Sequence, residues 1–96
     1  MRKLKITKEE LEKLYNDELN DILEQCDWIT YVDSFMVCRL VYLSLKRVDE
    51  EIDEDRLHEI YIAKIESLNL KDGEWSIRFG IKEIIDMIYD IIEKNL

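Results

Sequence analysis

Carboxylates are the side chains of this sequence whose number and spacing could do chemistry. The 96 residues contain 23 Asp and Glu against 14 Lys and Arg, and the net charge is −9. The densest acidic run consists of Asp49, Glu50, Glu51, Asp53, Glu54 and Asp55. It lacks the alternating pattern, the glycine and the closing Glu of a calcium loop. Acids ahead of a helix are also favoured by the helix dipole, so we interpret the run as a solvated linker and helix start and expect no metal site.

His58 is the only histidine, and it follows Glu54 by four residues and Asp55 by three. One carboxylate–histidine pair supplies too few ligands for a catalytic zinc or a helical di-metal centre. The sequence has no HExxH, GxSxG, GxGxxG or Walker motif, and its serines have no neighbouring histidine along the chain. A serine that is distant from His58 along the chain could still lie close to it in the folded protein. We expect no catalytic residue, no cofactor and no enzymatic activity.

The negative charge is concentrated in two segments, with −7 over residues 9–30 and −6 over residues 49–66. In the first segment, a row of acids recurs at helical spacing: Glu10, Asp17, Asp21 and Glu24. Neighbouring like charges slightly destabilise a helix, so the row is either a surface that keeps the protein soluble or a docking face for a basic partner. Phosphate backbones and anionic membranes repel such a chain, and we expect it to bind neither directly.

The length and composition indicate one domain over residues 1–96. The most apolar run, 31–45, is too short to span a bilayer and contains Asp33 and Arg39. The two cysteines, Cys26 and Cys38, lie at apolar helix positions and lack CxxC spacing, which is typical of buried reduced thiols. We therefore expect a soluble cytoplasmic protein.

The pattern of apolar residues predicts a mainly α fold, a bundle of three to four helices. The expected helices span about 8–26, 31–48, 54–66 and 81–94. Thr7 and Glu10 form a capping box at the first start, Thr30 with Asp33 is expected to cap the second helix, and Asp53 or a neighbour caps the third.

The helix expected at 31–48 is apolar nearly all round, so it must be covered nearly all round. It is either the central helix of the fold or part of a subunit interface. The second possibility predicts a homodimer that assembles through this helix or through the edge of a hairpin.

Both glycines of the chain lie within residues 67–80, and there is no proline. Trp75, Ile77 and Phe79 alternate with polar residues, which favours a short β-hairpin at 67–79 with Gly73 at a positive φ. In the alternative, Gly73 ends the third helix and the fold is an all-α four-helix bundle.

These features favour a small acidic protein-binding module, a stoichiometric inhibitor of a basic partner, with nucleic-acid-handling proteins among the candidate partners. The expected partner-binding residues are Glu10, Asp17, Asp21, Glu24, Asp53, Glu54, Asp55 and Trp75. In size and charge the chain is similar to phage or mobile-element inhibitors and to immunity proteins as a class. The alternatives are the homodimer and a winged-helix-like transcription regulator, which the acidic third helix disfavours.

Overall fold

The computed structural model describes residues 3–25, 33–70 and 79–96. Its helices are α1 (Lys8–Gln25), α2 (Ser34–Lys46), α3 (Glu54–Ser67) and α5 (Ile81–Asn95). Within these described ranges the protein is helical and contains no strand. The expectation of a mainly α fold is confirmed.

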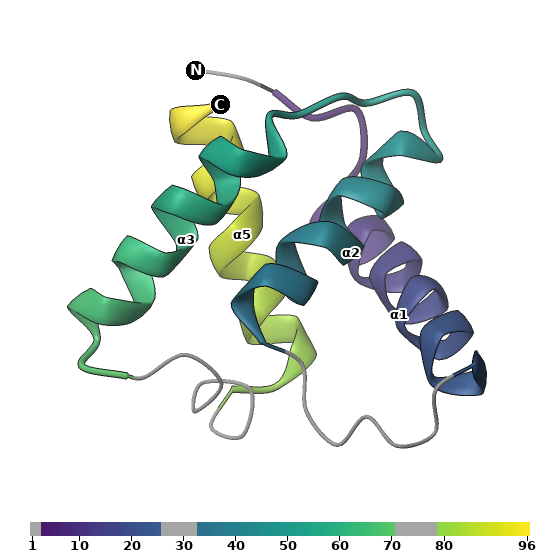
Figure 1. The fold of residues 1–96 in the computed structure, drawn as a ribbon. Coiled ribbons are helices and arrows are strands. Elements are labelled where there is room, and N and C mark those ends of the chain that lie inside the picture. Colours follow the sequence, from purple (N-terminus) through teal and green to yellow (C-terminus); the bar gives the residue numbers. More distant parts are fainter. Residues whose placement is uncertain (1–2, 26–32, 71–78) are drawn as a thin grey trace.

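The four helices close into a ring in which each helix packs against two others. α2 lies between α1 and α3, and α5 closes the ring by contacting α1 and α3 (Figure 1). α2, α3 and α5 alternate in direction along the bundle (Figure 1). The apolar side of each helix therefore faces one shared core, and its polar side faces outward.

The core of the described residues is made of aliphatic side chains, two tyrosines and Cys38. Each helix contributes residues that are almost fully inaccessible to solvent: Leu11 and Tyr15 from α1, Leu40 and Leu45 from α2, Leu57 and Tyr61 from α3, and Ile85, Ile88 and Ile92 from α5. Burial of side chains of this size stabilises a fold by about 1.5–3 kcal/mol each. Interior packing thus fixes which side of α1 and of α2 is exposed to solvent.

The start of α1 is the predicted capping box. The Glu10 amide donates to Thr7 Oγ1 at 3.2 Å, and the Thr7 amide donates to Glu10 Oε1 at 3.1 Å. Ile6 and Leu11, which flank the box, are both buried, as a hydrophobic staple requires.

The start and end of α2 correct the sequence-based prediction of a helix over 31–48. Asp33, not Thr30, is the N-cap: its backbone is extended and its carboxylate accepts the Met36 amide at 2.8 Å. Asp33 cannot be both an extended cap and a residue inside the helix. α2 is therefore confined to Ser34–Lys46.

α2 and α3 end in the same way, and neither end uses glycine. Asp49 (φ 57°) and Asn69 (φ 59°) adopt the left-handed conformation. The following amides, of Glu50 and Leu70, donate back to the carbonyl groups of Leu45 and Ile65. This is the hydrogen-bond pattern of a Schellman motif, with Asp or Asn in the place that glycine usually takes.

The end of α3 bears on the hairpin expected at 67–79. Ser67 is helical, and Leu68, Asn69 and Leu70 form the turn that closes the helix, so these residues do not form a strand. Leu68 and Leu70 are spaced as alternate residues of a strand would be, but they belong to the helix end, where Leu68 is exposed and Leu70 is buried. Phe79, at the other end of the predicted hairpin, lies in a bend and is half-buried against the core. Residues 71–78, including Gly73, lie outside the described residues.

The segment ahead of α1 packs against α5, which the sequence-based prediction did not include. Leu4 and Ile6 are buried, and Tyr89 donates its hydroxyl to the Ile6 carbonyl at 2.6 Å. Lys8 Nζ lies 3.4 Å from Asp90 Oδ1 and 5.7 Å from the centre of the Tyr89 ring. These contacts hold the start of α1 on α5.

Candidate functional site: the acidic α1 face

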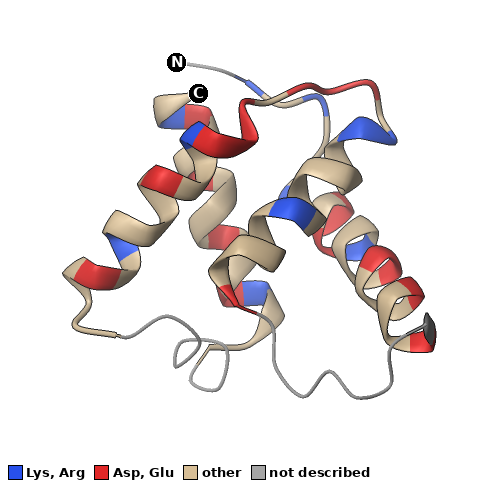
Figure 2. Ribbon diagram, viewed as in Figure 1, with Lys and Arg blue, Asp and Glu red and all other residues tan. Residues whose placement is uncertain are grey.

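The acidic α1 face consists of Glu10, Asp17, Asp21 and Glu24, and all four are exposed. The core takes the side of α1 that carries Leu11 and Tyr15, and at 100° per residue the four acids lie on the other side. Figure 2 shows acidic residues recurring along the outer side of α1. The four acids of the predicted row are therefore exposed on one side of the helix, with Lys13 and the half-buried Leu14 between Glu10 and Asp17.

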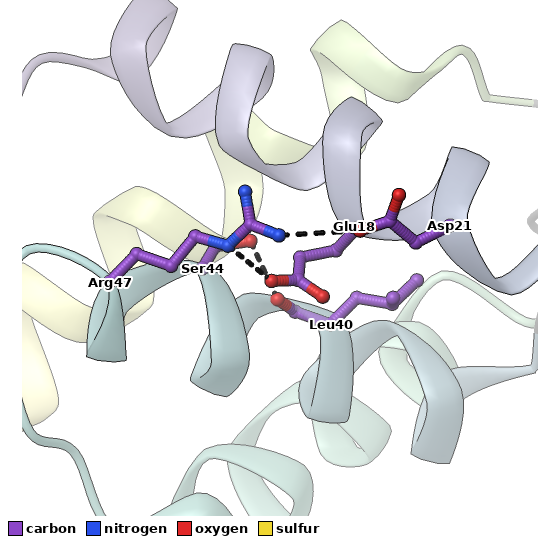
Figure 3. Close-up of polar contacts among 5 residues, drawn as sticks. All are labelled: Glu18, Asp21, Leu40, Ser44 and Arg47. Atoms are coloured by element: carbon purple, nitrogen blue, oxygen red, sulfur yellow. Dashed lines mark hydrogen bonds and ion pairs between the residues drawn. The ribbon is translucent and has the colours of Figure 1, made fainter.

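One cation from another helix partly neutralises this side of α1. Arg47, directly after α2, places Nε 2.6 Å from Glu18 Oε1 and Nη2 3.3 Å from Asp21 Oδ2 (Figure 3). The Glu18 side chain is only 14% exposed, whereas that of Asp21 is 58% exposed. Sequence reasoning missed Arg47 because its partners lie on a different helix.

Along the acidic α1 face, acids that have an internal contact alternate with acids that have none among the described residues. Glu10 is held by the capping box and Asp21 by Arg47. Asp17 and Glu24 form no ion pair or hydrogen bond with another described residue. Asp17 and Glu24 are therefore the charges of the face that a partner could engage without breaking an internal contact.

The second predicted cluster has mainly structural roles. The Asp53 carboxylate caps α3 by accepting the Arg56 amide at 3.1 Å. Glu54 Oε2 lies 3.0 Å from Arg39 Nε, which ties α3 to α2. Of this cluster only Asp55 has no contact of this kind within the described chain. Because α2 lies between α1 and α3 (Figure 1), the fold does not join the two acidic clusters into one site. Trp75 lies outside the described residues.

The single histidine contacts α2 instead of pairing with an acid. His58 Nε2 lies 3.4 Å from Ser34 Oγ, and its ring meets the Phe35 ring edge-on with 5.5 Å between centroids. Ser34 is fully buried, and Glu54 is bound to Arg39. The contact between Ser34 and His58 therefore links α2 to α3.

An open groove of about 280 Å³ lies between α3 and α5, with Lys64, Asp90 and Lys94 around Met87. In residues 3–25, 33–70 and 79–96 no three His, Cys, Asp or Glu side chains gather closely enough to hold a metal ion. In the same ranges no helix has the length and apolarity needed to cross a membrane.

Comparisons with protein-family models, with curated proteins and with solved structures give no match to this chain. The geometry and charge of its own residues therefore carry the functional argument.

Proposed function

We propose that this protein is a small, non-enzymatic, cytoplasmic binding module that acts as a stoichiometric inhibitor of a basic protein partner. Its docking surface is the acidic α1 face. The observation that supports the proposal is the alternation on this face of acids held by internal contacts with acids that have none. Asp17 and Glu24 are the residues that engage the partner.

The geometry of a helix suits this role. Asp17 and Glu24 are seven residues apart, so they lie on the same side of α1, about 10 Å apart along its axis. Both are carried on a helix whose opposite side is locked in the core, so binding orders little more than the side chains themselves. Charges presented in this way raise the association rate with a cationic surface.

Arg47 deepens the proposal by setting the order of contacts. Arg47 binds Asp21 through Nη2 alone, and the Asp21 carboxylate remains largely exposed to solvent. A partner cation can therefore share Asp21 after Asp17 and Glu24 have engaged. Surfaces that handle nucleic acids are rich in such cations, and covering them would block their normal ligand.

The proposal is tested by affinity capture from the native host with tagged protein. Wild-type protein is compared with Asp17→Asn/Glu24→Gln and with a matched control, Glu66→Gln/Glu83→Gln, which removes two exposed acids from α3 and α5. We expect one basic protein to be retained by the wild type and the control and lost from the α1 variant. Equal recovery on all three baits would show that the α1 row serves only as a solubilising surface.

A further inference from the structure

A second surface, on the outer side of α2, carries the opposite charge. It consists of Phe35, Arg39, Tyr42 and Lys46, which we name the α2 stripe. The spacing of four, three and four residues places all four within a narrow strip of the helix surface. The α2 stripe therefore alternates aromatic ring and cation over three turns, on a chain whose net charge is −9.

Phe35, Arg39 and Lys46 of the α2 stripe are exposed, while Tyr42 is half-buried against the core. The stripe is ordered by its own contacts. Phe35 is 57% exposed, the highest fraction for a large apolar side chain among the described residues. Arg39 Cζ and Lys46 Nζ lie 5.8 and 5.6 Å from the centre of the Tyr42 ring. Glu54 binds Arg39 and thereby lowers the net positive charge of the strip.

The same surface repeats every seven residues, with Phe35 and Tyr42, and Arg39 and Lys46, as the repeating pairs. Beside it, Met36 and Leu43 are half-buried and also seven residues apart. A seven-residue repeat is the spacing at which one helix packs along another. The fitting occupant is thus a helix.

The order of the residues identifies which helix. When two α2 helices are laid antiparallel about a point between residues 40 and 41, residue 35 of one faces residue 46 of the other, and residue 39 faces residue 42. Phe35 then meets Lys46 of the partner subunit, and Arg39 meets Tyr42 of the partner subunit. A parallel arrangement would place like charges against one another.

We propose that the α2 stripe is the two-fold interface of a homodimer, in which each aromatic ring of one copy receives a cation of the other. Cation–π contacts and the burial of Phe35 stabilise this pairing. A self-complementary patch is the form that an isologous dimer interface takes. The proposal is independent of the acidic α1 face.

Sedimentation of the purified full chain over a range of micromolar concentrations tests this dimer without any partner protein. We expect a monomer–dimer equilibrium, and because the two copies repel through their net charge, added salt should strengthen it. Tyr42→Ala and Phe35→Ala should each weaken the dimer at least about tenfold, since each removes a contact twice. Leu68→Ala, which shortens an exposed apolar side chain away from the α2 stripe, is the control and should leave it unchanged.

Cross-linking checks the register in a Cys26→Ser background, where buried Cys38 is shielded from reagent. In the antiparallel pairing, the two copies of residue 42 lie about 4.5 Å apart along the axis and the two copies of residue 35 about 16 Å apart. A short bis-maleimide should therefore link Tyr42→Cys and not Phe35→Cys. A monomer at every concentration, a dimer indifferent to Tyr42→Ala, or the reverse cross-linking pattern would overturn the proposal. These results leave the test of the α1 face unaffected.

Discussion

At the scale of single residues, ion pairs between helices decide which acids remain available to a partner. Arg47 binds the half-shielded Glu18 and the exposed Asp21, and Arg39 binds Glu54. The sequence alone identifies the acids and their spacing on one helix. It could not identify these pairings, because each joins residues that are brought together only by the packing of α2 against its neighbours.

The Arg47–Glu18 pair should contribute measurably to stability, because Glu18 is shielded from solvent. We expect Arg47→Met to lower the free energy of unfolding by about 1 kcal/mol. Arg56→Met is the matched control: its pair with Glu59 is exposed at both ends and should contribute less than about 0.5 kcal/mol. Denaturant unfolding of both variants, with Glu18→Gln to complete a double-mutant cycle, measures the difference. Equal losses for the two arginines would contradict this assignment.

Tyr15 should make the fold sensitive to alkaline pH. Burial, followed by electrostatic interaction with the nearby Cys38, raises the pKa of the Tyr15 phenol well above its ordinary value of 10.0. The unfolded chain therefore loses this proton before the folded chain does, so the stabilisation is present below pH 10 and is lost as the pH rises further. Tyr15→Phe should show a smaller fall of the unfolding free energy above pH 10 than the wild type. Parallel falls would show that other groups cause the alkaline loss.

At the scale of the elements, the polar caps were predictable to different degrees. The Thr7–Glu10 box was predicted and is confirmed, since both partners lie within four residues. Asp53 was likewise expected as a cap. The start of α2 was placed too early because Thr30 and Asp33 can both cap a helix, and only the structure shows which does so. The burial of Leu4 and Ile6 and the hydrogen bond between Ile6 and Tyr89 of α5 were missed, since a contact over that separation leaves no local pattern.

The end of α3 shows why glycine is an incomplete guide. The two glycines drew the sequence argument to residues 67–80, while the left-handed residue that ends the helix is Asn69. Asparagine tolerates this conformation because its short polar side chain can bond locally. A pattern based on glycine alone therefore overlooks such a helix end.

Substitutions at Asn69 test this helix end. Asn69→Gly should keep or slightly raise the free energy of unfolding, because glycine adopts a positive φ without strain. Asn69→Val should lower it by about 1–2 kcal/mol. Thermal and denaturant unfolding measure both. Equal free energies of unfolding for Asn69→Val and Asn69→Gly would contradict a left-handed backbone conformation at Asn69.

The start of α5 at Gly80 lacks a side-chain cap, so a substitution there can raise the stability of the protein. Gly80 is the N-cap of α5, has an ordinary extended backbone and makes no side-chain cap, and nothing lies within 4 Å of an added Cβ. Because Glu83 follows three residues later, Gly80→Ser creates a capping box and should stabilise the protein by about 0.5–1 kcal/mol. Gly80→Ala, which lacks the oxygen, is the control and should give no such gain. An equal gain from Ala would show that chain stiffness alone accounts for it.

At the scale of the whole molecule, the helix ring distributes charge by element. Figure 2 shows acidic residues recurring along α1 and basic residues on α2, where the α2 stripe also contains Phe35 and Tyr42. Periodicity predicted the acidic α1 face well, since an amphipathic helix must expose its polar side. The separation of this face from Asp53, Glu54 and Asp55 could not be predicted, because it depends on the order in which the helices pack.

The affinity of the purified partner for the α1 face, measured by titration calorimetry at several salt concentrations, tests the central claim most directly. We predict a one-to-one complex per chain whose affinity falls as salt rises. Asp17→Asn/Glu24→Gln should weaken it at least about tenfold and flatten its salt dependence, because two exposed charge contacts of the interface are lost. The control Glu66→Gln/Glu83→Gln should bind as the wild type does. An affinity that is indifferent to salt, or equal for the α1 variant and the wild type, would contradict the assignment of the acidic α1 face as the docking surface.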